Sequence, residues 1–411
     1  MVMCSTFNVL NYGADPSGRT SSSQSLHAAL HDMSVQGGGT LYFPPGHYIT
    51  GPFNLSSNSV LLLDGCTIEA ANETEFSLVP PLPSYGEGRD KLPNDKNGRF
   101  QPWIGVYYSY NVTITTNSSG TLHGQGSPWW IKKSERTLQN TPPHLLEVYQ
   151  SRDFSLGAPP FSPQNSLILL NSPFWNVHLY DSDNMHVHDV TILADPLAGN
   201  TDGVDPDSTR GVLIERVIYV GGDDGVAIKS GWDNAGILYN KPVVNVTVRD
   251  SSFTTRACCV CVGSEMSGGA QDITVHNVSC VGVGSGMFVK SSPGRGGFVR
   301  NFNFTDSTFV GVNLAFGIMM TYGDDPEPPL IVNKSALPVM DNFLFKGIKG
   351  TGIVTPGSIS GSPGKGAPGI FITNVKVEDV DLGTTANPWE CVNVSGTSNN
   401  VFPQPCPQLG G

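Results

Sequence analysis

Apolar residues recur along this chain in a fixed order: apolar, any residue, apolar, two of any kind, apolar, any residue, apolar. Alternation of this type is typical of strands with one buried face. Copies or looser variants of the pattern begin at Met185, Val212, Val246, Ile273, Phe302, Phe343 and Val375. These starts lie 27 to 41 residues apart, so the repeat is irregular and some turns carry insertions.

A strand unit this short cannot bury its own apolar face, but stacked units bury one another's. The pattern therefore predicts an all-β parallel β-helix, which we expect to form a single domain over residues 1–411. A β-sandwich of many short strands is the alternative, although Asn-Gly hairpin signals are sparse. Segments 80–104, 134–164 and 351–369 are expected to be projecting loops, and the tail 383–411 shows little periodicity.

The N-terminal part, about residues 1–50, is predicted to cap the coil. Ser22 to Met33 has the spacing of a short helix, with Leu26, Ala29 and Leu30 on one face, and a run of three glycines follows it. Such a helix covers an open end of the coil whose unpaired strand edge otherwise invites aggregation.

Composition and charge narrow the class of partner. Charged residues make up only 14% of the chain, while it holds 48 glycines and 31 prolines, which fits many strands and turns. The formal charge is −12 and no basic stripe is visible, so no nucleic-acid partner is expected. No apolar run approaches the roughly 18 residues that span a membrane. An acidic protein still binds an acidic polymer when a few cations line its site.

Two features favour an exported protein, placed outside the cell or in a cell wall, although Met1–Val9 is too short and too polar for a signal peptide. The eight cysteines include Cys391 and Cys406 in the tail, where a disulfide is predicted; the other pairings are open. Asn-x-Ser/Thr sequons, which mark candidate glycosylation sites, occur at nine asparagines: Asn54, Asn72, Asn111, Asn117, Asn245, Asn277, Asn303, Asn333 and Asn393.

The candidate chemistry lies in two Asp-rich segments, Asn200–Asp207 and Gly221–Lys229. Asp202 and Asp223 are 21 residues apart, about one coil, so Asp202, Asp223 and Asp224 are expected to converge. Clustered carboxylates repel, so one of them should hold its proton more tightly than a free Asp. A pair divided into acid and base is what glycoside hydrolysis requires.

Other Asp residues have a simpler interpretation. Asp205 and Asp207 flank Pro206 and are predicted to be turn residues. The tripeptide Gly323–Asp325 repeats the Gly-Asp-Asp sequence but has no Asp one coil earlier, and we expect it to be a surface loop.

The chain resembles the polygalacturonase-like proteins of glycoside hydrolase family 28, in particular their plant-type branch. Besides the two Asp-rich segments, the resemblance rests on Gly37–Gly46, Gly124–Gly126, Asn171–Trp175, Gly263–Gly269 and Gly294–Gly297. It implies a right-handed parallel β-helix and inverting hydrolysis of a pectin-type polysaccharide. In that family Asp223 looks like the general acid, and Asp202 and Asp224 like the bases, with acid and base carboxyls about 6.5–9.5 Å apart.

The resemblance also implies a site for the substrate's carboxylate. Lys290 matches the lysine of the family's Arg-Ile-Lys motif, but Phe288 stands where the arginine belongs. Phe cannot form a bidentate bond to a carboxylate, although it can stack on a sugar face. The family's Gly-His-Gly histidine is replaced by Cys258, and the cysteine that usually follows Asp-Asp by Gly225.

Further substrate-binding candidates are Lys229, Arg295 and Tyr322, with Trp129, Trp130 and Trp175 as other sugar platforms. No cofactor and no metal site is expected, because the cluster Cys258–Cys261 lacks a second pair that would complete a zinc set. These thiols are instead expected to fill apolar strand positions.

The preferred function is hydrolysis of galacturonosyl bonds by a monomer. Hydrolysis of another pectic polymer such as rhamnogalacturonan, a polysaccharide lyase and a non-catalytic wall-binding β-helix are the alternatives. A lyase would use the clustered carboxylates for Ca²⁺. A wall-binding protein would have no need of all three Asp residues.

Overall fold

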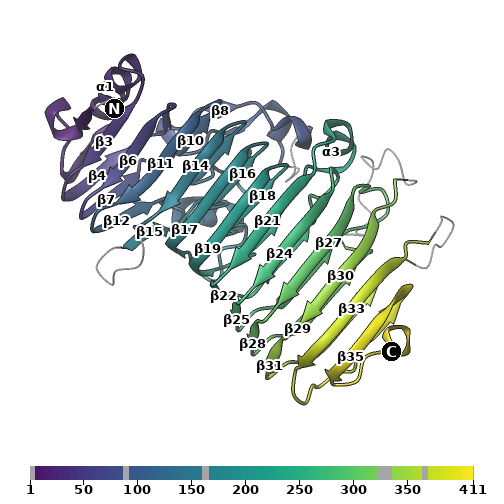
Figure 1. Ribbon diagram of the computed structural model, residues 1–411. Helices are drawn as coiled ribbons and strands as arrows, with labels where there is room; N and C mark the ends of the chain where they lie inside the picture. The colour runs from purple at the N-terminus through teal and green to yellow at the C-terminus, as the bar shows by residue number, and fades with distance from the viewer. Residues whose placement is uncertain (1–4, 87–91, 160–165, 323–335, 363–368, 411) are drawn as a thin grey trace.

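A computed structural model describes residues 5–86, 92–159, 166–322, 336–362 and 369–410. The chain winds as a right-handed parallel β-helix whose coils stack along one long axis, from α1 at one end to β35 at the other (Figure 1). All strand pairings within its two large sheets are parallel, as predicted from the repeat.

One sheet has 11 strands and carries one side of every coil. Its members are β5 (Phe53–Leu55), β10 (Ile104–Tyr107), β13 (Leu146–Tyr149), β16 (Val177–Tyr180), β18 (Val204–Asp207), β20 (Val226–Ile228), β23 (Cys258–Gly263), β26 (Ser285–Lys290), β29 (Leu314–Met319), β32 (Thr355–Ser360) and β34 (Glu390–Val392).

The other large sheet has 22 strands because long strands such as β19 pass a corner of the coil and pair with two strands of the next. Its members are β1 (Thr6–Asn8), β2 (Ser17–Ser21), β3 (Gly39–Phe43), β4 (Gly46–Thr50), β6 (Ser59–Leu63), β7 (Cys66–Ala70), β11 (Tyr110–Thr116), β12 (Ser119–His123), β14 (Arg152–Gly157), β15 (Ser166–Leu170), β17 (Asp183–Leu193), β19 (Arg210–Gly221), β21 (Val243–Arg249), β22 (Ser252–Thr255), β24 (Ala270–His276), β25 (Ser279–Val281), β27 (Phe298–Thr305), β28 (Thr308–Val310), β30 (Val339–Lys346), β31 (Lys349–Thr351), β33 (Ile372–Asp381) and β35 (Val394–Phe402).

Three α-helices and five short 3₁₀ helices complete the described elements. They are α1 (Ser23–Val35), α2 (Ser127–Ser134), α3 (Asp233–Tyr239), η1 (Val9–Tyr12), η2 (Glu73–Glu75), η3 (Pro83–Tyr85), η4 (Asp95–Asn97) and η5 (Pro407–Leu409). The short antiparallel pair β8 (Leu78–Val79) and β9 (Arg99–Phe100) lies outside the coil.

The predicted repeat matches the register in which neighbouring coils pair. Each of the seven starts is paired with the next, in the order Met185, Val212, Val246, Ile273, Phe302, Phe343 and Val375. All seven side chains are buried in one core, so each coil covers the apolar face of its neighbour. Between Val212 and Val246 the extra residues lie in the connection that contains α3, between β20 and β21.

The residue before each of these starts is left-handed, and it is Asn at five of the seven positions, with Gly211 and Asp272 at the other two. Asn184, Asn245, Asn301 and their equivalents have φ near +60°, a left-handed conformation that Asn tolerates better than most residues. Their side chains connect neighbouring coils: Asn301 donates to Asp272 at 2.7 Å, and Asn342 donates to Asn301 at 2.8 Å. The sequon residue Asn245 therefore has a structural reason to be Asn.

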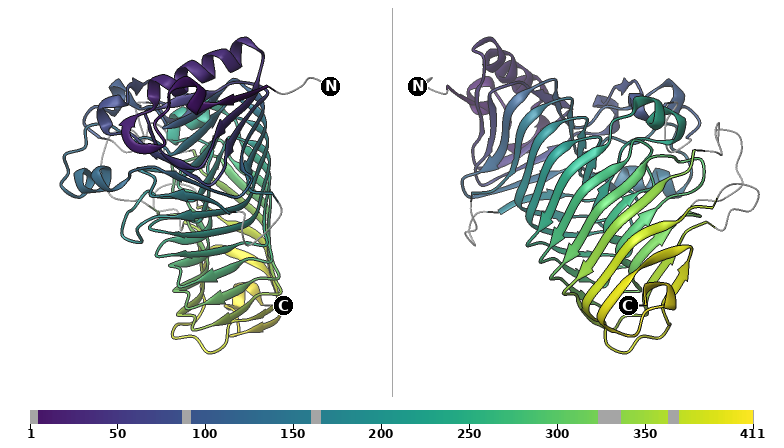
Figure 2. Two further views of the ribbon diagram at one scale, coloured as in Figure 1. Left: turned by 90° about the vertical axis from the view of Figure 1, so that its left-hand side faces the viewer. Right: turned by 45° about the vertical axis from the view of Figure 1, so that its right-hand side comes forward.

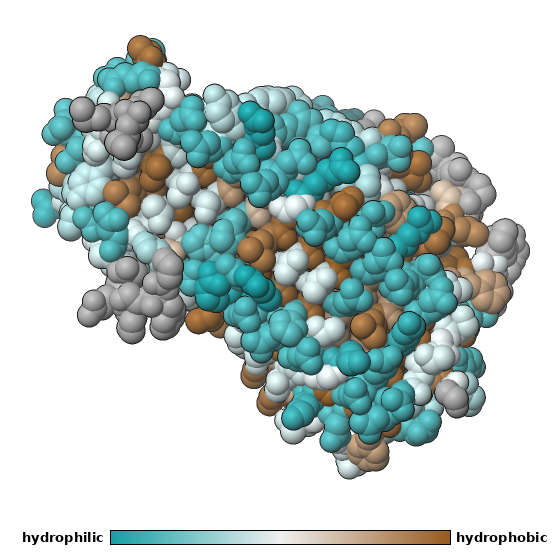
Figure 3. Space-filling view, viewed as in Figure 1, coloured by the Kyte–Doolittle hydropathy of each residue, from teal (hydrophilic) through white to brown (hydrophobic). Residues whose placement is uncertain are grey.

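Helix α1 caps the N-terminal end of the coil, as predicted (Figure 2). Leu26, Ala29 and Met33 are buried against the core, and Leu30 packs partly against it. None of the helices in the described part of the chain is long and apolar enough to cross a membrane. Polar side chains cover most of the face shown in Figure 3, with single apolar residues between them.

The predicted loops are only partly loops. Segment 134–164 contains β13 and β14, and segment 351–369 contains β32, so those parts of the prediction are wrong. These strands carry buried polar residues such as Glu147, which hide the two-residue alternation. Gly323–Asp325 lies outside the described residues.

We expect the aromatic stack in the C-terminal coils to set the stability of that end. Phe316 and Phe345 are both fully buried, with ring centroids 4.5 Å apart. Phe316→Ala should lower the free energy of unfolding by about 3–5 kcal/mol, because it leaves a cavity in a close-packed core. Urea unfolding followed by tryptophan fluorescence measures this. Phe371→Ala, at a side chain that is 64% exposed, is the control and should change stability little; equal losses would contradict the packing argument.

Candidate active site

The three Asp residues lie where two neighbouring coils enter the 11-stranded sheet. Asp202 comes just before β18, and Asp223 and Asp224 come just before β20. The two strands pair through Val204 and Val226, which places their approaches side by side. One oxygen from each of the three carboxylates lies within 4.8 Å of the other two. The structure thus brings together the residues that the one-coil spacing singled out.

Backbone amides fix Asp223. Its Oδ2 accepts a hydrogen bond from the amide of Asn200 at 2.7 Å, and its Oδ1 accepts one from the amide of Asp224 at 2.9 Å. The Asn200 contact joins the two coils directly. Asp223 is half-buried, whereas Asp202 and Asp224 are only 3% and 2% exposed, so Asp223 is the member of the trio most open to solvent.

Asp224 is held on both oxygens. Lys290 Nζ donates to Oδ2 at 2.5 Å, and the amide of Cys258 donates to Oδ1 at 3.1 Å. Burial opposes the charge on Lys290, but the carboxylate of Asp224 outweighs it and raises the pKa of the lysine. The lysine that the family resemblance assigned to the substrate's carboxylate is therefore a cation in contact with one of the three Asp residues.

Lys229 lies beneath Asp202 rather than on the surface. Its side chain is 2% exposed, and its Nζ lies 3.1 Å from Glu265, 3.4 Å from Asp205 and 3.5 Å from Asp202. The ammonium also lies 4.3 Å from the centre of the Trp175 ring. A lysine enclosed in this way can orient Asp202 and balance its charge.

Asp205 and Asp207 are not turn residues, so that prediction is wrong. Both lie in β18 and are fully buried, on the side of the strand that faces polar partners. Burial, and then the charge of Asp202, raise the pKa of Asp205 well above its usual value. The carboxyl that holds its proton tightly is therefore Asp205, which lies outside the predicted trio, three residues after Asp202 and in contact with it.

The remaining predicted binding residues form an aromatic edge near Lys290. Phe288 is half-buried and meets Tyr322 edge to face, with centroids 6.0 Å apart, and Tyr322 is 36% exposed. Arg295 stacks on Trp232 at 3.6 Å, pairs with Asp233 at 3.0 Å and donates to the carbonyl of Ser264 at 2.8 Å.

Two of the tryptophans are unsuited to be sugar platforms. Trp129 and Trp175 are 4% and 2% exposed and pack inside the protein. Trp130 is half-buried, and its Nε1 donates to the carbonyl of Ser172 at 3.2 Å.

Sequence reasoning missed two charged residues at the site. Glu265 lies within Gly263–Gly269, one of the segments that carry the family resemblance, so this segment could have indicated Glu265 as a site residue. Lys133 is on α2, and its ammonium donates to the carbonyl of Gly199 at 3.1 Å. Lys133 Nζ and Asp223 Oδ2 both lie within 4 Å of the point that a Cβ on Gly199 would occupy. Nothing in the sequence around Lys133 indicates this position.

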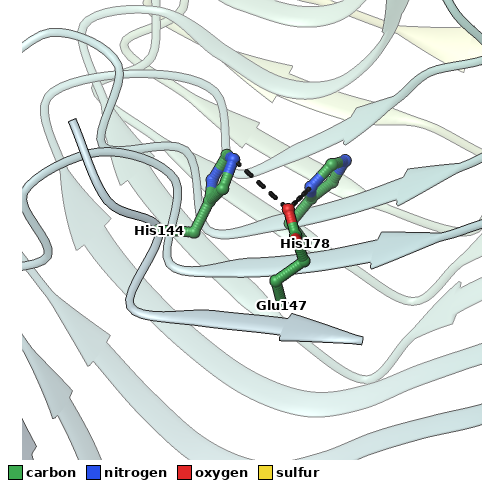
Figure 4. Close-up of side chains that lie close together, drawn as sticks. All are labelled: His144, Glu147 and His178. Atoms are coloured by element: carbon green, nitrogen blue, oxygen red, sulfur yellow. Dashed lines mark hydrogen bonds and ion pairs between the residues drawn. The ribbon is translucent and has the colours of Figure 1, made fainter. Parts of the chain in front are cut away.

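A second buried polar cluster lies on β13 and β16, the two strands that precede β18 in the 11-stranded sheet (Figure 4). His178 Nδ1 contacts Glu147 at 3.2 Å and its Nε2 contacts Asp207 at 3.1 Å, while Arg99 donates to Glu147 at 2.7 Å. His144 lies 3.7 Å from Glu147. Through Asp207 and Asp205 on one strand, this cluster continues toward Lys229 and Asp202.

The two histidines of the cluster differ in pKa. Burial and the neighbouring His178 hold the pKa of His144 well below its usual value. Burial also opposes protonation of His178, but its hydrogen bonds to Asp207 and Glu147 outweigh that effect and raise its pKa. His178 therefore keeps its proton to a higher pH than His144 does.

The raised pKa of His178 predicts how stability varies with pH. Because the folded pKa lies above the unfolded value of about 6.5, the proton on His178 stabilises the fold fully below that pH, and this contribution is lost as pH rises through the folded pKa. Urea midpoints of the wild type should therefore fall above pH 6.5, and His178→Gln should remove this part of the decrease. His276→Gln, at a side chain that is 49% exposed, should keep the wild-type profile; an unchanged profile for His178→Gln would contradict the assignment.

Comparison with known proteins places the chain in a family. A probable polygalacturonase from Vitis vinifera is 33% identical over 98% of this chain and 80% of that protein. An endo-polygalacturonase from Pectobacterium parmentieri is 28% identical over 85% of this chain and 80% of that protein.

Solved structures share the fold. A hyperthermoactive exopolygalacturonase from Thermotoga maritima has a TM-score of 0.81 at 24% identity, covering 98% of this chain and 92% of that one. A polygalacturonase from Erwinia carotovora has a TM-score of 0.70 at 21% identity, covering 96% of this chain and 97% of that one. The profile of the family described as Glycosyl hydrolases family 28 matches residues 41–401. The chain therefore belongs to glycosyl hydrolases family 28.

Proposed function

We propose that this protein hydrolyses galacturonosyl bonds in a pectic polysaccharide, with Asp223 as general acid and Asp202 and Asp224 as bases. The observation that carries the proposal is the convergence of these three carboxylates on neighbouring coils, with one oxygen of each within 4.8 Å of the others. Lys229 lies beside Asp202, and Lys290 lies beside Asp224. Relatives named as polygalacturonases support the choice of polymer.

The division of roles follows from the surroundings of each carboxylate. A base must carry negative charge before the reaction, and Lys229 and Lys290 supply positive charge beside Asp202 and Asp224. The acid must reach the oxygen of the leaving sugar, and Asp223 is the most exposed of the three.

Water would be bound and activated by Asp202 and Asp224 together. The closest oxygens of the trio are nearer to one another than the roughly 6.5–9.5 Å that separates acid and base groups in most inverting enzymes. The attacking water in this proposal therefore lies beside the carboxylates, against the two bases, rather than between acid and base. Inversion itself rests on the family resemblance and is read from the anomer of the first product.

The substrate class fits the charges at the site. Each galacturonate carries a carboxylate, and Lys290 and Lys133 place cations next to the trio in a protein whose net charge is −12. Lys229, which is buried among carboxylates, is assigned to positioning Asp202 instead of contacting substrate. We further propose that the protein acts as a secreted monomer in the extracellular space or the cell wall, without a cofactor.

One observation favours a second substrate. The aromatic pair Phe288 and Tyr322 replaces one cation with an apolar surface beside Lys290. A neutral sugar stacks on such a surface better than a carboxylate binds to it. Another pectic polymer with neutral sugars, such as rhamnogalacturonan, is therefore the second candidate.

The central test is a reducing-end assay on polygalacturonic acid and on rhamnogalacturonan, with ultraviolet absorbance followed in parallel. The wild type should release reducing ends from one of them without a gain in absorbance. Asp223→Asn should lower kcat by roughly 100- to 10,000-fold, because it removes the proton donor, while polymer binding is retained.

Asp306→Asn is the matched control, at a side chain that is 63% exposed, and should keep wild-type turnover. A gain in ultraviolet absorbance would indicate a lyase. Binding without turnover in the wild type would indicate a wall-binding protein. NMR of the first product identifies its anomer, and retention of configuration would reject the assigned roles of the bases.

Phe288→Arg tests which sugar lies beside Lys290. Adding a guanidinium there should lower KM for polygalacturonic acid roughly tenfold, the value of one charge-assisted hydrogen bond, and should leave kcat nearly unchanged. Phe288→Leu is the control, because it removes the ring without adding charge. If Phe288→Arg instead weakens activity on polygalacturonic acid and on rhamnogalacturonan alike, the carboxylate does not bind at this position.

A further inference from the structure

A cysteine pair lies against Asp224. Cys258 and Cys261, both on β23, form a disulfide with their Cα atoms 6.1 Å apart. Both residues are buried, at 2% and 0% exposure. The sequence had suggested thiols in apolar strand positions, and the structure corrects this: Cys258 bonds to Cys261, and Cys259 bonds to Cys280.

The Cys258–Cys261 disulfide closes too short a loop to stabilise the folded protein much. Cys259–Cys280 joins residues 21 apart on successive coils, and Cys391–Cys406, which was predicted, joins residues 15 apart in the tail. A disulfide restricts the unfolded chain more as its loop lengthens, and Cys258–Cys261 spans only three residues. Its position therefore calls for an explanation other than stability.

Both sulfur atoms adjoin a carboxylate of the active site. The two Sγ atoms and one carboxylate oxygen of Asp224 all lie within 4.8 Å of one another. The amide of Cys258 also donates to Asp224 Oδ1. A chemical change at this cysteine pair therefore alters the immediate surroundings of the Asp224 carboxylate.

Opening the disulfide would create a set of metal ligands. A dithiol reductant supplies two electrons that break the S–S bond; each sulfur takes up a proton, and the reductant closes to its own cyclic disulfide. Two thiolates and a carboxylate then face one point, which is a donor set that suits zinc and other thiophilic ions. A tetrahedral ion with bonds of about 2.0–2.3 Å keeps its ligands roughly 3.5 Å apart, so the three side chains need only small rotations.

The charge balance of the site also suits a divalent cation. A divalent ion bound by two thiolates adds no net charge, because each thiol releases its proton on binding. The existing balance between Asp224 and Lys290 is therefore preserved. The cluster of His144, Glu147 and His178, drawn in Figure 4, suits a thiophilic ion less well because it offers no thiolate.

We propose that the reduced pair Cys258 and Cys261, together with Asp224, is a binding site for one thiophilic divalent cation, with water as a further ligand. Binding takes up the carboxylate of Asp224 and so stops hydrolysis; this consequence rests on the proposed function. The oxidised protein has no such site, so the cation acts only after reduction.

Metal binding is measured first, without substrate. The full-length protein is treated with a dithiol reductant under anaerobic conditions, the reductant is removed, and Cd²⁺ is titrated while the ultraviolet absorbance of cadmium–thiolate bonds is followed. The reduced wild type should bind one more equivalent than the untreated protein. Cys258→Ser/Cys261→Ser, treated identically, should lack that equivalent, although it retains the four cysteines of the other two disulfides and the buried Cys66.

Activity is measured second, each protein against its own metal-free rate. Reduced wild type should lose at least tenfold in turnover with equimolar Zn²⁺ and recover with a chelator, and the double variant should not respond. Equal Cd²⁺ binding by the double variant would overturn the proposal, as would an extra equivalent in the unreduced protein. If no pectic polymer is hydrolysed in any state, the proposed function fails, while the titration still decides the metal site. Circular dichroism of both proteins before and after reduction checks that each remains folded.

Discussion

The parallel stacking of coils is the constraint on which the rest of this protein depends. No strand of the coil can bury its apolar face alone, so each coil must present that face to the next in fixed register. That register pairs Met185 with Val212, Val212 with Val246, and so on through the chain. Because strands in a sheet are about 4.8 Å apart, any two positions one coil apart become neighbours. The active site uses this spacing: Asp202 and the Asp223–Asp224 pair approach neighbouring strands of one sheet.

Bringing so many carboxylates together requires buried cations. Lys229 lies among Asp202, Asp205 and Glu265, and Lys290 contacts Asp224, while Arg99 pairs with Glu147 and His178 bridges Glu147 and Asp207. An unpaired charge in such surroundings is strongly unfavourable. Polar residues therefore replace apolar ones on the outward side of β13, β16 and β18, and the sheet becomes a support for the catalytic groups as well as a wall of the core.

The residues that we propose to govern specificity lie where the chain departs from its family. Phe288 with Tyr322 forms an aromatic edge beside Lys290, and the pair Cys258–Cys261 takes the place next to Asp224. Both changes surround an unchanged trio of carboxylates. In the proposed function the trio carries out hydrolysis, and the proposed roles of its surroundings are to select the sugar and to control whether Asp224 is available.

The sequence by itself determined the coil, the capping helix and the trio, because each depends on a local pattern or on a spacing along the chain. A period of two within strands and of one coil between them specifies which residues share a face, and this is sufficient to bring Asp202 to Asp223. The tertiary structure alone decided the roles of Asp205, Lys229, Lys133 and Cys258. Asp205 follows Asp202 by three residues and resembles a turn residue, but strand pairing buries it against Lys229. Lys133 contacts Gly199, near Asp223, from a helix on an insertion, and no periodicity predicts where an insertion packs. The charges and bonding of these groups depend on burial and on partners from distant coils, which only the folded chain brings together.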